Sequence, residues 1–160
     1  MTRLQRPVSL FLIVLSLTSC HSRTKSAPEA AGPKTAEAAL AAYDAKVAAM
    51  NSELAALKAD PADKEWVKKK LASMAAVDLY AFKYRWGLKL DQKETELFTK
   101  AFGPRVDSVV KANTTDLKPL IARYGWIKIS EFGDDASNDA AVIVQHSEHD
   151  HEFQIEVLKC

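Results

Sequence analysis

The spacing of large apolar residues between Leu40 and Leu57 constrains the fold of this chain more than any other sequence feature. They recur at alternating steps of three and four, the a/d pattern of an amphipathic helix over about three heptads; they are Leu40, Tyr43, Val47, Met50, Leu54 and Leu57. Alanine, which favours helix and allows close packing, fills much of the remainder. We expect a helix over 35–59 that packs within its own domain, with an intermolecular coiled coil as the alternative.

A second helix is expected after a turn at Pro61, which cannot continue the first. Asp63 is a typical N-cap, and an apolar pattern runs from there to about Trp86, just before the helix terminator Gly87. Asp78 lies within the main apolar stripe of this helix, which consists of Val67, Leu71, Met74 and Ala81. The two helices together predict a helical hairpin.

Capping signals divide most of the remaining chain into short helices. The first is expected over 91–102, where Asp91 and Glu94 resemble a capping box, and the second begins at Gly103-Pro104. Asp116 is expected to cap a third, which Gly125 stops. Residues 126–129 alternate and favour a short extended piece, whereas residues 130–138 are typical of a loop. The predicted fold class is therefore mainly α, a single domain in which several short helices follow the hairpin.

The N-terminus has the plan of a secretory signal over residues 1–19. Two arginines precede the apolar run Val8–Leu17, whose ten residues would cover about 15 Å as a helix, half of the hydrocarbon core. A permanent membrane span is therefore not expected. Leu17-Thr18-Ser19-Cys20 resembles a bacterial lipobox, in which the cysteine is acylated before the signal is removed. The alternative is an ordinary signal in which Cys20 is incidental.

Lipidation of Cys20 predicts three regions along the chain. Residues 1–19 are the signal peptide, residues 20–34 are the lipidated cysteine with a flexible tether rich in Ser, Ala and Pro, and residues 35–160 are the helical domain. The protein is then held in the bacterial cell envelope by acyl chains and faces the periplasm. His21 follows the cysteine, and by resemblance to Gram-negative sorting it favours the outer membrane.

Charge and cysteine content exclude some functions. The chain has 22 basic and 21 acidic residues, so a broad nucleic-acid surface is not expected. Removal of a signal with two arginines and no acid leaves 20 basic and 21 acidic residues, a net charge of −1. Two cysteines exclude a four-cysteine zinc site, and acylation of Cys20 leaves Cys160 as the remaining thiol.

Three of the four histidines lie between residues 138 and 154. If Asn138 caps a helix that continues through this segment, His146, His149 and Asp150 share one face, with Gln145 at its edge. Two imidazoles and a carboxylate would suit a divalent metal such as zinc or iron. His146 and Asp150 alone would suit general acid–base catalysis.

A second interpretation makes the same residues structural. Asp150 would cap a separate final helix over 151–158, with Phe153 and Val157 packed inward. A cap at that position would break the shared face and leave a structural polar cluster.

Gly125-Trp126, followed by Gln145-His146, Asp150 and Phe153-Gln154, form a pattern that resembles the DUF6624 family of uncharacterised proteins. The similarity covers about residues 62–160 and is specific only from Asn113 onward. Matching positions are Gly125, Trp126, Gln145, His146, Asp150, Phe153 and Gln154, with weaker matches at Asn113, Leu117 and Lys118. Family members have proline where this chain has Ile127 and His151 and aspartate where it has Glu148, and they continue with further motifs. The resemblance thus implies a shortened or C-terminally truncated member, and it implies no established activity.

Two functions are consistent with these patterns. The chain has no Gly-x-Ser-x-Gly, phosphate loop or His-Glu-x-x-His motif, so we expect a lipid-anchored envelope protein that binds or scaffolds. Its partner would be another envelope protein or a second copy, through the helix over 35–59. The alternative is a small hydrolase-like or metal-dependent enzyme that uses Gln145, His146, His149 and Asp150.

Overall fold

The structure is a computed structural model that describes residues 32–56 and 58–160. The expected signal peptide, the lipobox with Cys20 and most of the expected tether lie outside the described residues. Every regular element within the described ranges is helical, which confirms the predicted fold class.

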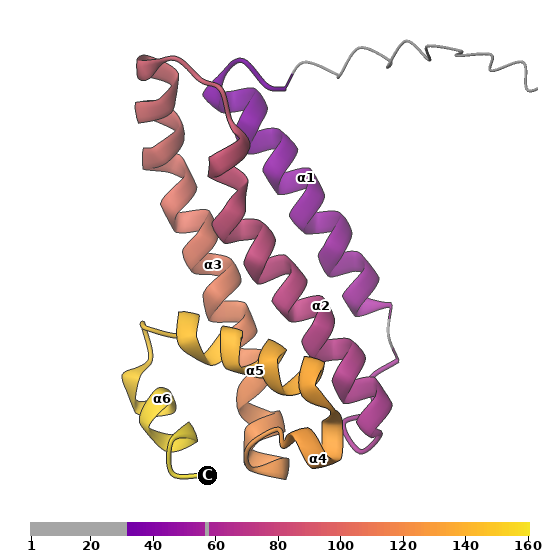
Figure 1. The fold of residues 1–160 in the computed structure, drawn as a ribbon. Coiled ribbons are helices and arrows are strands. Elements are labelled where there is room, and N and C mark those ends of the chain that lie inside the picture. The colour runs from indigo at the N-terminus through magenta and orange to yellow at the C-terminus, as the bar shows by residue number, and fades with distance from the viewer. Residues whose placement is uncertain (1–31, 57) are drawn as a thin grey trace, which may run out of the picture. The chain divides into compact units, whose positions relative to one another are not determined.

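Three long helices form an antiparallel bundle, α1 (Ala36–Ala55), α2 (Lys64–Lys83) and α3 (Gln92–Tyr124) (Figure 1). The 3₁₀ turn η1 (Tyr84–Gly87) joins α2 to the segment that leads into α3. The predicted caps are confirmed, since the side chains of Thr35, Asp63 and Asp91 each accept a backbone N–H of the helix that follows. Local capping chemistry therefore sets where all three helices begin.

The third helix is continuous, and the prediction of three separate helices over this stretch is wrong. Pro104 and Pro119 both lie inside α3, and Asp116 pairs with Lys70 of α2 instead of capping a helix. A proline removes one helical hydrogen bond. Burial of one face of α3 against α2 offsets that loss, and Val110, Leu117 and Ile121 belong to that buried face.

Three short helices follow α3 and cover one part of the bundle. They are α4 (Ile129–Phe132), α5 (Asp134–His146) and α6 (His151–Val157). The predicted loop over 130–138 is wrong, because α4 and the first turns of α5 occupy most of it. Of the extended piece predicted over 126–129, only Ile129 lies in a helix, and Lys128 has extended backbone. Gly125 (φ 68°) and Gly133 (φ 86°) have left-handed backbone that favours glycine, and they separate α3, α4 and α5.

The core consists of two clusters along the bundle. One lies where α5 and α6 pack on α2 and α3, and it includes Leu71, Met74, Leu117, Ile143 and Phe153. The other lies among α1, α2 and the first half of α3, and it includes Tyr43, Val77, Phe98 and Phe102. The predicted stripe of the first helix packs in its own domain, since Leu40, Val47 and Met50 contact the second cluster.

Residues 32–160 form one compact unit. This unit contains both core clusters and all of the helices above, so it has the packing that independent folding requires. Among the helices of the described ranges, none combines the length and the apolar character that crossing a membrane requires.

Candidate functional site

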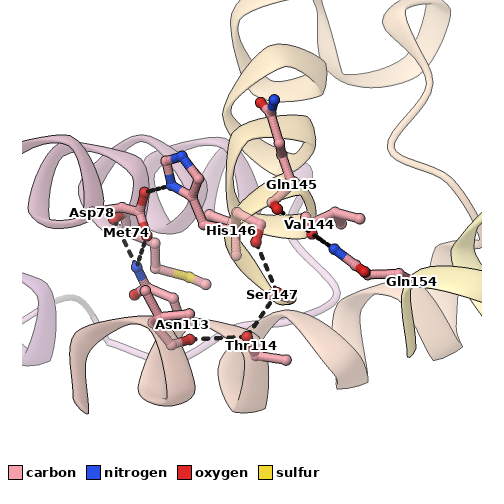
Figure 2. Close-up of polar contacts among 11 residues, drawn as sticks. Met74, Asp78, Asn113, Thr114, Val144, Gln145, His146, Ser147 and Gln154 are labelled. Carbon is pink, nitrogen blue, oxygen red and sulfur yellow. Dashed lines mark hydrogen bonds and ion pairs between the residues drawn. The ribbon is translucent and has the colours of Figure 1, made fainter. Parts of the chain in front are cut away.

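A buried carboxylate on α2 is the centre of the candidate site. Asp78 lies on the core-facing side of α2 with no solvent exposure, and its Oδ2 contacts Nδ1 of His146, the last residue of α5 (Figure 2). Burial raises the pKa of Asp78 above its usual 3.8, while the bonds from His146 and Asn113 act in the opposite direction. The site therefore holds a carboxyl group whose charge depends on these two partners.

The imidazole of His146 is held by the carboxyl group of Asp78 and by the ring of Phe82. Its ring stacks on Phe82, one turn beyond Asp78, with centroids 3.9 Å apart. The side chain is 24% exposed, and Nε2 has no hydrogen-bond partner among the residues that the structure describes. In the neutral imidazole, a carboxylate at Nδ1 keeps the proton on that nitrogen, so the lone pair of Nε2 faces solvent. This is the arrangement that a general base requires.

Asn113 of α3 fixes the other side of the carboxylate. Its Nδ2 donates to Asp78 Oδ1 at 3.4 Å and to the carbonyl oxygen of Met74 at 3.2 Å (Figure 2). Asn113 is 7% exposed, so both bonds lie in the protein interior. Both oxygens of Asp78 thus have a partner, which is what a buried carboxylate needs.

A pair of buried hydroxyls ties the end of α5 to α3. Ser147 Oγ and Thr114 Oγ1 lie 2.7 Å apart, and each also lies within hydrogen-bond distance of a helix carbonyl, of Ile143 and Val110 respectively. Two hydroxyl protons serve three contacts, so two of the three are hydrogen bonds at any moment. Because Ser147 follows His146 directly, this contact fixes where the imidazole lies.

Asp150 pairs with a lysine instead of with His146, the partner predicted from sequence. It caps α6 by accepting the N–H of Phe153 at 3.1 Å, and it pairs with Lys118 at 2.5 Å. Lys118 lowers the pKa of this carboxyl. The prediction of one helical face shared by His146, His149 and Asp150 is therefore wrong, because α5 ends at His146 and Asp150 begins a new helix. The structure agrees with the second interpretation, a final helix capped by Asp150.

The other predicted metal-site residues do not join this centre. Gln145 and His149 are exposed, and His149 lies in the link between α5 and α6. Within residues 32–56 and 58–160, no three histidine, cysteine or acidic side chains are placed to hold a metal ion. The two acid–base groups that the structure does bring together are Asp78 and His146.

Several of the residues on which the resemblance to DUF6624 rests hold the C-terminal helices in place. Gln154 Nε2 donates to the carbonyl oxygen of Val144 at 2.9 Å, which links α6 to α5 (Figure 2). Phe153 is buried in the first core cluster, Trp126 packs against that cluster, and Gly125 is the C-cap of α3.

An apolar cavity lies beside this centre, between the end of α2, η1 and the first half of α3. Its volume is about 480 Å³, and its apolar walls include Phe82, Trp86, Leu88, Phe98, Phe102 and Val106. Thr95, Thr99, Gly103 and Asp107 also line it, spaced four residues apart on α3. Figure 1 shows α5 crossing the half of the bundle remote from η1, and no residue of α5 lines the cavity. Phe82 touches both the cavity and His146.

Asp78, Asn113 and the cavity were not identified as site features from sequence. One signal for Asp78 was available, because an acidic residue in the middle of an apolar helix stripe needs a buried partner. Its partner is 68 residues away, so residue spacing could not identify it.

Comparison of the chain with models of protein families, with curated proteins and with solved structures finds no match.

Proposed function

We propose that this protein is a lipid-anchored envelope protein whose helical domain binds a small apolar ligand. The cavity between α2, η1 and α3 carries this proposal. Its volume of about 480 Å³ falls in the range of ligand-binding pockets, and aromatic and aliphatic walls with a few polar groups are typical of them. The lipobox-like residues 17–20 support the anchor.

The exposure of Trp86 supports ligand binding at this cavity. Its side chain lines the cavity, yet 75% of the residue is accessible to solvent. A bound apolar molecule would cover part of this surface and gain the free energy of removing it from water. Binding therefore completes the packing of this part of the bundle.

Gly103 provides the test, because a side chain added there meets no atom within 4 Å. Gly103→Leu extends a side chain into the cavity, whereas Gly103→Ala does not fill it. Both changes favour helix over glycine by about 0.5–1 kcal/mol, so neither is expected to unfold α3. We expect residues 32–160 and the Ala variant to bind the neutral fluorophore N-phenyl-1-naphthylamine saturably, and the Leu variant to bind it at least about tenfold more weakly. Equal binding by the Leu variant, or none by the wild type, would contradict the proposal.

Asp78 and His146 favour a second candidate function, general base catalysis of ester or amide hydrolysis. The solvent-facing Nε2 with a buried carboxylate behind the imidazole would accept a proton from an attacking water. In this case His146→Gln is expected to lower the rate of aryl ester hydrolysis by about a hundredfold. His149→Gln removes an exposed histidine and is the matched control, which should leave the rate unchanged. A His146→Gln protein as active as the wild type would exclude this candidate.

A further inference from the structure

We infer that the ligand of the cavity is one acyl chain of an anionic membrane lipid, with Arg85 on its headgroup. This inference rests on the proposed binding function and adds the chemical class and the source of the ligand. Three observations carry it, namely an exposed cation at the cavity, the chemistry of the cavity wall, and the place where α1 begins.

Arg85 is the cation that lines the cavity. It is exposed, its guanidinium lies 4.9 Å from the ring of Trp86, and it forms no ion pair with any carboxylate in the described part of the chain. Arginine and tryptophan suit a membrane interface, because each combines an apolar body with a polar group. An anionic headgroup would give Arg85 its missing partner.

The wall of the cavity suits a chain of methylene groups. Phe98 and Phe102 are 3% and 5% exposed and belong to the second core cluster, so the cavity reaches the core of the bundle. Thr95 and Thr99 contribute the neutral polar side chains, and Asp107 the single carboxylate. Asp107 would repel an anionic group, so the headgroup is expected at Arg85 and the apolar chain along the aromatic wall.

The N-terminus of α1, which the expected tether precedes, lies at the same end of the bundle as the cavity. The N–H of Ala36, the first residue of α1, donates to Glu94 of α3 at 2.7 Å, and the hydroxyl of Tyr84 in η1 donates to the carbonyl oxygen of Ala39 at 2.7 Å. The start of α1 therefore lies beside η1 and the start of α3, at the end of the bundle that Figure 1 shows. Residues of η1 and of the first half of α3 line the cavity, so the cavity lies toward the same end. Fifteen residues, 21–35, separate Cys20 from the first residue of α1, and such a length spans at most about 54 Å. Lipidation at Cys20 would thus keep the cavity within reach of the bilayer.

The test uses residues 32–160, which lack the anchor, and vesicles of phosphatidylcholine with or without phosphatidylglycerol. The acyl chains are brominated, since bromine quenches only tryptophans that contact the chain. We expect flotation with the anionic vesicles and quenching of tryptophan emission. Both Trp86→Phe and Gly103→Leu should remove most of this quenching.

Single-charge variants test the headgroup contact. Arg85→Gln is expected to weaken binding to anionic vesicles about fivefold. Lys69→Gln removes one charge from an exposed position on α2 away from the cavity, and it should leave the affinity unchanged. Asp107→Asn removes the carboxylate of the cavity wall and should bind anionic vesicles more tightly than the wild type. A loss of binding would indicate a cationic or zwitterionic group and overturn the inference.

Two further outcomes would overturn the inference, namely equal binding to neutral vesicles and undiminished quenching in Gly103→Leu. Failure of the inference differs from failure of the proposed function. Saturable binding of N-phenyl-1-naphthylamine without vesicle binding would reject the lipid alone, whereas absence of both would reject the binding function as well.

Discussion

Asp78 shows how one residue controls the charge of the candidate site. A carboxylate without solvent exposure is costly unless its oxygens are paired, and here His146 and Asn113 provide the partners. The raised pKa indicates that desolvation outweighs these contacts. The folded protein consequently binds the Asp78 proton more tightly than the unfolded chain does.

The raised pKa predicts a pH dependence for Asp78→Asn. The protonated carboxyl stabilises the fold below the unfolded value of 3.8, and this contribution is lost as the pH rises through the folded pKa. The free energy of unfolding of the wild type, minus that of Asp78→Asn, should therefore fall as the pH rises over this window. Urea denaturation at a series of pH values measures the difference. A difference that grows with pH would contradict the assigned direction.

The C-terminal helix α6 depends on side-chain contacts for its stability. A helix of seven residues has little stability of its own. The cap by Asp150, the bond from Gln154 to Val144 and burial of Phe153 hold it against the rest of the domain. Local opening is therefore expected in α6 before it occurs in the three-helix bundle.

Removal of the Asp150 cap should loosen α6 alone. In Asp150→Ala, amide hydrogen exchange in α6 should become faster while exchange in α2 and α3 stays unchanged. Glu152→Gln is the matched control, because Glu152 is exposed in the first turn of the same helix. Lys118 lowers the pKa of Asp150, so the contribution of the ion pair is present above 3.8 and is lost as the pH falls through the folded pKa. Unchanged exchange in the Ala variant would show that the cap does not hold α6.

Element boundaries were predictable where local chemistry determines them. The caps at Thr35, Asp63 and Asp91 follow from side-chain oxygens beside free backbone N–H groups. Gly103-Pro104 carries a comparable local signal to end a helix, yet α3 continues through it. Packing against α2 decides the outcome there, and no window of local sequence contains that contact.

At the scale of the whole molecule, the fold class follows from sequence more readily than the site does. Apolar periodicity predicts helices and a hairpin because both depend on residues that are near in sequence. The contact between Asp78 and His146 joins two helices 68 residues apart. Sequence spacing instead grouped His146 with Asp150, four residues away, and the structure gives each of these residues a different partner.

The continuity of α3 has a mechanical consequence. Its 33 residues form one rod of about 50 Å. The first half of the rod supplies the cavity wall from Thr95 to Asp107, and the residues just beyond supply Asn113 and Thr114. A molecule that enters the cavity and tilts this rod must also move the amide that holds Asp78. The cavity and the Asp78–His146 pair are thus coupled through α3. Ligand binding in the cavity should therefore shift the ring resonances of His146 in a nuclear magnetic resonance spectrum.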